Sequence, residues 1–573
     1  MSKTLAIIGA RLNSSRLPGK HLLPLPANRE GDNLPMIGHL LKRLQKCQCI
    51  NLIELATTND DFNRPLIRWA DANQLLCEPF DGDVNDLMGR LDSVIQRHQP
   101  DYIVYICGDC PLVDPEFIDH ALSALQQSDC DTIALKPNIE SIHEGMAFYS
   151  LNGWQKLLAA SQTDMTREHV GYADKLTPVL DKLLINDSAD YSSVQHRISV
   201  DTPADFHFME EIYRRWYSHH APASTVELAW VVSELRNDAW LRQLNAHVTQ
   251  KSPEKKYSKV SLYCHCSQQV GLGHLKRSAM LAESLQEHLG VGTSLIVQGN
   301  PLELSWLSTS VTWHHTESDW LSALTEDTNS VIILDLHPDF ADMESIQQLC
   351  AQKKTAGTQF VALDKLSSLL PWVELLFVPS FYTELDDPKV SAGWQNYFIQ
   401  SKRGTDKQDL ILILTGGSDA LGYGEKLPDE LHQVCDPDWQ YIWVQGPAAK
   451  DPKIPKRSII ERHVNPDNLP ELIASAKIVM TCYGLTLFEA MAQGAAVILL
   501  PTADICSESE KQALACYDAV MISTTLQESC HMLQRLQHDP MEITKLANQS
   551  SQLLRHSNGL TRLTKAIEAL LKQ

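Results

Sequence analysis

Apolar runs of strand length alternate with amphipathic stretches along the first part of the chain. In chain order the expected elements are strand 5–9, helix 36–46, strand 52–57, helix 64–73, strand 102–107 and helix 115–126. Strands that alternate with helices in this way are typical of a parallel sheet with helices on its faces. A helix at 205–216 and a helical tail to about 246 complete the pattern. We therefore expect an α/β domain at residues 1–248.

The same alternation starts again after a polar segment at 249–259, which contains a proline and lacks apolar periodicity. Such composition is typical of an interdomain linker. Beyond it the expected elements are strand 260–264, a glycine loop at 270–273, helix 275–289, and strands 331–334, 360–363 and 410–414. A break near 401–409 precedes the last of these strands. We expect two α/β subdomains, residues 260–403 and 404–573, with a cleft between them.

Charge and length exclude several classes of protein. The 573 residues are too many for one core, and the net charge of −22 opposes binding to nucleic acid. No apolar run is long enough to cross a membrane, and the N-terminus does not resemble a signal peptide. The 14 cysteines show no zinc-ribbon spacing, so we expect reduced thiols in a cytoplasmic protein.

A basic loop follows the first strand and carries the first candidate chemistry. Arg11, Ser14, Arg16 and Lys20 offer cationic and hydroxyl donors, and a Pro-Gly turn lets backbone amides point inward. This combination suits a nucleoside triphosphate. A solvated basic loop after a buried strand is the alternative. An ATPase P-loop is disfavoured, because there the lysine is followed by Ser or Thr and here it is followed by His21.

Two aspartates at strand ends are candidate magnesium ligands. Asp109 follows the strand at 102–107, and Asp201 follows an apolar segment in a similar position. Magnesium bound to a triphosphate typically needs one or two protein carboxylates. The alternative is that both are turn or cap residues, a common role for Asp beside proline.

Residues 3–215 resemble sugar cytidylyltransferases of the spore-coat polysaccharide type, which are related to the enzymes that activate 3-deoxy-manno-octulosonate and acylneuraminate. The shared motifs are ARLNSSRLPGK at 10–20, ATTND at 56–60, GDCPLVDP at 108–115, REHV at 167–170 and VDTPADF at 200–206. The resemblance implies a Rossmann-like, GT-A-like fold in which a sugar hydroxyl attacks the α-phosphate of CTP. It also implies that Asp109 and Asp201 hold Mg²⁺, that Arg11 and Lys20 act on the reacting phosphates, and that Ser14 and Arg16 bind the nucleotide.

One segment departs from this family. Spore-coat members usually carry Gly-Leu-Asp-Val-Glu where this chain reads Gly-Met-Ala-Phe-Tyr at 145–149. The stretch at 143–145 is closer to the octulosonate-activating relatives, and His143 could be a surface residue or an acceptor contact. The acceptor sugar stays open.

A second glycine loop precedes His274 at the expected start of a helix. Helix dipole and free amides favour a diphosphate there, and the imidazole could act as a general base. A solvated histidine at a helix start is the alternative. Glu489, which follows a strand and a glycine turn, could accept ribose hydroxyls, or simply favour the helix dipole.

Residues 260–570 resemble the UDP-sugar hydrolase of the pseudaminic-acid pathway and related spore-coat glycosyltransferases, all of GT-B architecture. The shared motifs are QQVGLGHLKRSAMLAESL at 268–285, TGGSD at 415–419 and GLTLFEAMAQG at 484–494. The resemblance implies that His274 activates water or an acceptor hydroxyl and that Glu489 holds the ribose. The glycines implied to line the diphosphate are Gly271, Gly273, Gly416 and Gly417. His265 stands where the hydrolases have aspartate, which removes a carboxylate that could orient the base.

The sequence therefore predicts a bifunctional enzyme of surface-polysaccharide or nonulosonic-acid biosynthesis, with a CTP-dependent sugar cytidylyltransferase fused to a UDP-sugar hydrolase. A glycosyltransferase, or a UDP-sugar-binding module without catalysis, is the alternative for the C-terminal half. The expected ligands are CTP with a sugar acid, Mg²⁺ and a UDP-sugar. A homodimer is left open.

Overall fold

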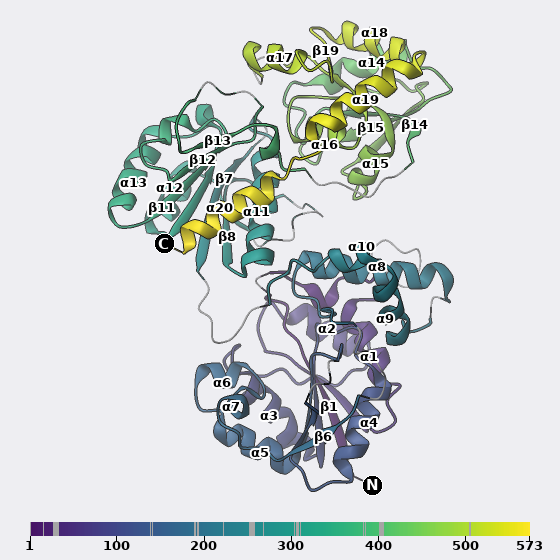
Figure 1. The fold of residues 1–573 in the computed structure, drawn as a ribbon, viewed down its shortest axis with the longest axis vertical. Helices are drawn as coiled ribbons and strands as arrows, with labels where there is room; N and C mark the ends of the chain where they lie inside the picture. The colour runs from purple at the N-terminus through teal and green to yellow at the C-terminus, as the bar shows by residue number, and fades with distance from the viewer. Residues whose placement is uncertain are drawn as a thin grey trace. The chain divides into compact units, whose positions relative to one another are not determined.

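The computed structural model describes residues 2–572 except 15, 27–33, 138, 140, 188–190, 192–193, 222, 251–257, 268, 303, 305–306, 308, 310, 382, 384, 400–405 and 503–505. The chain divides into two compact units, residues 1–256 and 257–573 (Figure 1). The division falls within the predicted linker, most of which lies outside the described residues.

The first unit contains a six-stranded sheet in the order β2-β1-β3-β5-β4-β6. Its strands are β1 (Thr4–Gly9), β2 (Leu52–Ala56), β3 (Tyr102–Cys107), β4 (Thr132–Leu135), β5 (Met146–Ser150) and β6 (Lys182–Ile185). All neighbours pair in parallel except β5, which runs antiparallel to β3 and β4. No helix is described between β4 and β5, and an antiparallel strand needs no crossover helix. The strand–helix rhythm predicted the parallel part of the sheet and gave no sign of this reversed strand.

Helices cover both faces of this sheet (Figure 1). They are α1 (Met36–Leu44), α2 (Arg64–Ala72), α3 (Leu87–His98), α4 (Pro115–Gln126), α5 (Leu151–Ala160), α6 (Asp164–Glu168) and α7 (Tyr172–Leu176). Successive strand residues face opposite sides, so Ala6 and Ile8 pack against α1, α2 and α4, while Leu5 and Ile7 pack against α3 and α5. The sheet is therefore buried on both faces.

A helical extension follows the sheet and has a core of its own. It consists of α8 (Pro203–His219), α9 (Leu228–Asn237) and α10 (Ala239–Gln243). Phe208, Ile212 and Val231 are fully buried there. Thr202 caps α8 and exchanges hydrogen bonds with Asp205, a capping box that fixes where Asp201 leaves the preceding segment.

The second unit contains two parallel sheets. The first has the order β13-β12-β11-β10-β7-β8-β9 and the second the order β16-β15-β14-β17-β18-β19. Strands of the first are β7 (Lys259–Cys266), β8 (Gly292–Gly299), β9 (Val311–His314), β10 (Val331–Asp335), β11 (Gln359–Leu363), β12 (Leu375–Val378) and β13 (Val390–Ala392). Strands of the second are β14 (Gln408–Leu414), β15 (Gln440–Gln445), β16 (Ile460–Val464), β17 (Ala476–Thr481), β18 (Ala496–Leu499) and β19 (Met521–Ile522). Two parallel α/β layers in one unit are the arrangement that the sequence analysis expects for a GT-B-like region.

Helices flank both sheets of the second unit. They are α11 (Gly273–Leu289), α12 (Glu317–Glu326), α13 (Met343–Thr355), α14 (Leu427–His432), α15 (Leu469–Ser475), α16 (Leu485–Ala492), α17 (Glu508–Ala515), α18 (Leu526–Gln537), α19 (Pro540–Leu554) and α20 (Gly559–Leu571). None of the described helices is long and apolar enough to span a membrane.

The last helix returns to the first sheet of the second unit. Helix α20 lies beside α11 (Figure 1). Leu563 and Ile567 of α20 join the core around α11, and the hydroxyls of Ser284 and Thr564 lie 2.8 Å apart. At the start of α20 a Cβ on Gly559 would lie 2.0 Å from the carbonyl oxygen of Asn396. Only glycine fits this close backbone approach. The chain thus returns from the second sheet to the first, where the amides of Asn558 and Gly559 donate to the carbonyls of Gln395 and Tyr397.

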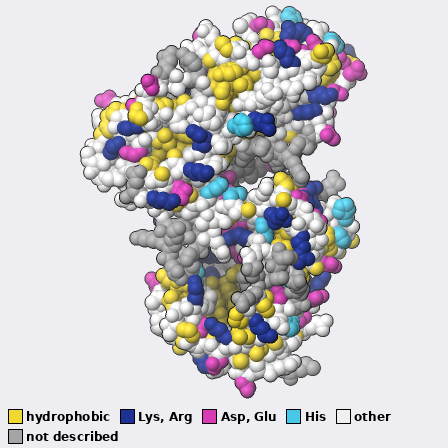
Figure 2. All heavy atoms as spheres, in the orientation of Figure 1, with side chains coloured by type: hydrophobic (Ala, Val, Ile, Leu, Met, Phe, Trp, Pro, Cys, Tyr) yellow, Lys and Arg dark blue, Asp and Glu magenta, His cyan; other side chains and the backbone are white. Residues whose placement is uncertain are grey.

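Charged side chains of both signs are interspersed on the face shown in Figure 2.

Candidate functional site

Each of the three sheets has a point at which the strand order reverses, and ligands of α/β sheets bind beyond the carboxyl ends of the strands there. These points lie between β1 and β3, between β7 and β10, and between β14 and β17. All the predicted site residues that follow strands lie near one of these three places.

The first switch point brings the basic loop beside Asp109. Gly9 at the end of β1 is in register with Cys107 at the end of β3, and the Gly108 amide donates to the Gly9 carbonyl at 2.8 Å. A Cβ on Gly108 would lie 2.8 Å from the Ala10 Cβ, so glycine permits this close approach. Asp109 follows directly.

Lys20 lies at the centre of this site. Its Nζ donates at 2.8 Å to Asp109 Oδ2, to Asp201 Oδ1 and to the Val200 carbonyl, so all three ammonium donors are used. The residue is 5 % exposed. Burial alone would lower the pKa of Lys20, but the two carboxylates outweigh it and hold the pKa well above its usual range. The lysine is therefore charged.

Two arginines complete the charge arrangement around Asp201. Arg16 Nη2 lies 2.9 Å from Asp201 Oδ2, and Arg197 contacts the same oxygen. Burial alone would raise the pKa of Asp201, but Lys20, Arg16 and Arg197 hold it far below its usual range. The sequence analysis did not single out Arg197, although it lies four residues before Asp201.

The two carboxylates suit a hard divalent cation. Asp109 and Asp201 keep 23 % and 25 % of their side chains exposed, and each places an oxygen at 2.8 Å from one ammonium. Converging carboxylate oxygens are the donors that Mg²⁺ prefers. These residues therefore fit the predicted cation.

Arg11 lies apart from this cluster. Its Nη1 donates to the Val84 carbonyl at 3.1 Å and to Asn85 Oδ1 at 3.0 Å, and its Nη2 lies 3.9 Å from Glu168. Arg11 thus reaches across the switch point to the segment before α3. Ser14 uses its hydroxyl to accept from the Leu17 amide at 3.3 Å, and Ser15 lies outside the described residues.

The ATTND motif anchors the basic loop through a residue that the sequence analysis missed. Asn63, which is fully buried, accepts from the Leu12 amide at 2.7 Å. Its Nδ2 donates to Thr58 Oγ1 at 2.8 Å and to Asp60 Oδ2 at 2.9 Å. The motif therefore holds the start of the loop, and nothing in the local pattern marks Asn63, which lies three residues beyond it.

Two further residues support the aspartates. His21 donates from Nδ1 to the Gly108 carbonyl at 3.1 Å, and burial, followed by the charge of Lys20, lowers its pKa to about 4. It is therefore neutral at pH 7. Glu144 accepts from the backbone amides of Ile198 and Ser199, which precede Asp201.

The side chain of His143 is buried. Its side chain is 3 % exposed, its Nε2 lies 3.1 Å from Asp187 Oδ1, and its ring stacks on Phe117 at 4.0 Å. His143 is therefore not the solvent-exposed surface histidine that was one of its two expected roles.

In the second unit His274 meets a carboxylate that the sequence analysis missed. Asp335 ends β10, beside β7, and its Oδ1 lies 2.6 Å from His274 Nδ1. Asp335 is 1 % exposed. An Nδ1–H that donates to Asp335 leaves Nε2 as the basic nitrogen. None of the described residues hydrogen-bonds that Nε2.

Arg277 holds Asp335 in place. Its Nε donates to Asp335 Oδ2 at 2.8 Å and its Nη2 to Oδ1 at 2.5 Å, while Nη1 donates to Asp364 at 2.9 Å. Burial alone would raise the pKa of Asp335, but Arg277 and His274 hold it well below its usual range. The aspartate is therefore ionised.

His265 does not take over the role of the missing aspartate. It is 1 % exposed and packs edge-on against Trp320 with ring centroids 5.1 Å apart. Burial, followed by the charge of His274, lowers its pKa to about 4. Asp335, at the end of the neighbouring strand β10, places a different carboxylate beside His274.

The third switch point faces the glycine loop of α11 within the second unit. A Cβ on Gly417 would lie 2.5 Å from Leu272 Cδ1, and one on Gly271 would lie 3.8 Å from Ser418 Oγ. Gly416 has a φ of 90° and Gly271 a φ of 78°, which favours glycine at both. Around Gly273 and Gly416 a Cβ would meet nothing within 4 Å, so the backbone there is open to a ligand.

Glu489 lies on α16 at the same place and is 6 % exposed. Its Oε1 accepts from Lys276 Nζ at 2.7 Å, an ion pair that joins α16 to α11. The structure thus brings His274 at the start of α11, Glu489 of α16 and the four predicted glycines together within one unit.

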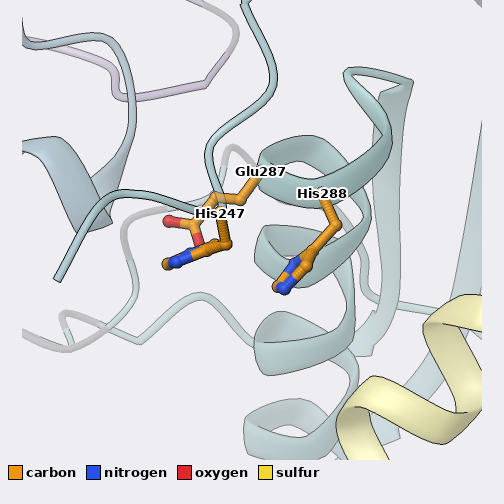
Figure 3. Close-up of side chains that lie close together, drawn as sticks. All are labelled: His247, Glu287 and His288. Atoms are coloured by element: carbon orange, nitrogen blue, oxygen red, sulfur yellow. The ribbon is translucent and has the colours of Figure 1, made fainter. Parts of the chain in front are cut away.

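Figure 3 shows Glu287 and His288 at the end of α11 together with His247. His247 belongs to the first unit and the other two residues to the second, so the three do not form a site within either unit.

Comparison with known proteins finds a family match within the first unit. Residues 5–226 match the family model described as Cytidylyltransferase. An uncharacterized protein of Methanocaldococcus jannaschii, MJ1063, is 27 % identical over 251 residues, 44 % of this chain and 97 % of that protein. The spore coat polysaccharide biosynthesis protein SpsF of Bacillus subtilis is 26 % identical over 217 residues, 38 % of this chain and 88 % of that protein.

Among solved structures, the calicheamicin glycosyltransferase CalG4 is similar to this chain, with 14 % identity and a TM-score of 0.40. The similarity covers 56 % of this chain and 99 % of CalG4.

The loops at the first switch point that carry the sequence motifs all lie within residues 5–226, which match the family model. The N-terminal region of this chain therefore belongs to the cytidylyltransferase family.

Proposed function

We propose that the first unit transfers CMP from CTP to the anomeric hydroxyl of a sugar acid. The hydroxyl oxygen forms a bond to the α-phosphorus, the bond from that phosphorus to the bridging β-phosphate oxygen breaks, and pyrophosphate leaves. The hydroxyl proton passes to solvent. The cluster of Lys20, Arg16 and Arg197 around Asp109 and Asp201 carries this proposal, because it concentrates the charges that phosphoryl chemistry requires.

The residues of this cluster have separable tasks. Lys20 and Arg16 bind phosphate oxygens and stabilise the charge that develops on pyrophosphate. Arg11, on the other side of the loop, binds the nucleotide near the segment before α3. Asp109 and Asp201 would hold Mg²⁺, which supplies positive charge to the phosphates when bound.

The acceptor follows from the resemblance alone, which favours a nonulosonic or octulosonic acid. The test is pyrophosphate release by the purified chain with CTP and Mg²⁺, across pseudaminic, legionaminic, neuraminic and octulosonic acids. Release with one acid supports the proposal and names the substrate. No release with any of them, despite CTP binding, would contradict a sugar-acid acceptor.

We further propose that the second unit acts on a UDP-sugar, with His274 as general base. The observation that favours catalysis over a binding module is the His274–Asp335 pair, since a buried, ionised aspartate would orient the imidazole so that Nε2 faces a reacting hydroxyl. Nε2 takes the proton as the oxygen of water or of an acceptor bonds to the anomeric carbon and UDP leaves.

Hydrolysis and transfer are distinguished by product. UDP and free sugar formed without an added acceptor identify a hydrolase, and UDP release that requires an acceptor identifies a transferase. UDP binding without turnover by the wild-type chain would contradict the catalytic proposal and favour the binding module.

A further inference from the structure

Lys20 occupies the position between the two aspartates that a divalent cation would need. Its ammonium lies 2.8 Å from one oxygen of Asp109 and 2.8 Å from one oxygen of Asp201. Magnesium in proteins binds such oxygens at about 2.0 to 2.1 Å. A cation that used both oxygens would therefore overlap the ammonium.

The ammonium is held firmly in this position. Its third hydrogen bond goes to the Val200 carbonyl at 2.8 Å, and the residue is 5 % exposed. Displacing Lys20 would leave a buried cation without acceptors, which is costly unless new acceptors arrive. A triphosphate is the source of such acceptors, because its oxygens are negative and suit an ammonium.

Lys20 balances the charge of the two aspartates to different degrees. Asp201 is also paired with Arg16 and Arg197. Among the described residues, Asp109 has an ion pair with Lys20 alone. Withdrawal of Lys20 would therefore leave Asp109 as an uncompensated carboxylate and create the demand for another cation.

We propose that Lys20 is a built-in substitute cation, which excludes a divalent metal from Asp109 and Asp201 until a nucleoside triphosphate draws its ammonium away. The proposal rests on the proposed role of the two aspartates as metal ligands. Metal and nucleotide then enter this site together. The resting protein keeps its carboxylates neutralised without a bound metal.

The test is Mn²⁺ binding by electron paramagnetic resonance to the full chain without nucleotide. Lys20→Met removes the competing cation and should tighten Mn²⁺ binding at least tenfold, since a charge-assisted pair contributes roughly that much or more. Lys46→Met, at an exposed position, changes the net charge equally and should leave the affinity unchanged. Equal Mn²⁺ affinity in wild type and Lys20→Met would overturn the proposal.

Two further variants keep the result interpretable. Lys20→Gln retains hydrogen-bonding capacity without charge, so it should also tighten Mn²⁺ binding if Lys20→Met fails to fold by circular dichroism. Adding Asp109→Asn to either variant should abolish the gained affinity, and a gain that persists would place the metal elsewhere. Pyrophosphate release that survives Asp109→Asn alone would refute the proposed metal ligands. Tight Mn²⁺ binding to the wild type without nucleotide would refute only the role of Lys20.

Discussion

The anchor of the basic loop gives a prediction whose size follows from the structure. Asn63→Ala removes the acceptor of the Leu12 amide, at 2.7 Å, and the donor to Thr58 and Asp60. An orphaned buried amide costs about 1 to 3 kcal/mol, so we expect a loss of about 2 kcal/mol in the unfolding free energy of the first unit. For a domain of this size that loss lowers the melting temperature by about 4 to 8 °C.

The same change should weaken CTP binding, because the start of the loop that carries Arg16 and Lys20 loses its fixed position. Differential scanning calorimetry and the KM for CTP measure the two effects. Asn59→Ala is the matched control, since Asn59 belongs to the same motif but bonds Asp81 at an exposed site. It should shift the melting temperature by less than about 1 °C. Wild-type values of both quantities in Asn63→Ala would refute the anchoring role.

Two other predictions concern the carboxylates. Asp335→Asn should lower UDP release by up to about 10⁴-fold, because an asparagine in place of the aspartate that orients a general-base imidazole favours the wrong tautomer. Pyrophosphate release should stay unchanged, and an equal loss of both activities would contradict independent sites. The pKa values of Asp201 and Asp335 are held below the ordinary value of 3.8, so their contributions to stability are present above that pH and lost as the pH falls through and below it. Calorimetry from pH 7 to pH 3 should show both units melting progressively lower in the acid range, and constant melting temperatures would contradict the assigned ion pairs.

The sequence predicts much of the first site because strand ends can be read from the apolar pattern. The predicted strand at 102–107 and helix at 115–126 coincide with β3 and α4. Asp109 and Lys20, which follow β3 and β1, accordingly meet at one switch point, where Asp201 joins them. The expected strand end before Asp201 is wrong, because residues 194–200 form no strand. Arg11 belongs to the same loop but points the other way, because loop residues on either side of a turn face different neighbours.

The missed residues share a physical cause. Asp335 is the last residue of a fully buried strand, and Asp109 lies two residues beyond one, so the apolar pattern marks both positions. The role of Asp335 as partner of His274 depends on β10 lying beside β7. Strand order is a long-range property that local periodicity does not contain. Asn63 and α20 were missed for the same reason, since each acts on a segment far away in the chain.

The central claim is that Asp109, held beside Lys20 and Asp201, is needed for nucleotidyl transfer by the first unit and is not needed for the UDP-sugar activity of the second unit. The most direct test compares pyrophosphate release and UDP release in wild type, Asp109→Asn and Asp129→Asn, with folding verified by circular dichroism. Asp129 is exposed and lies away from the switch point, so its variant controls for the loss of one carboxylate. The account predicts that Asp109→Asn loses pyrophosphate release and keeps UDP release, while Asp129→Asn keeps both. Pyrophosphate release at the wild-type rate in Asp109→Asn would contradict it.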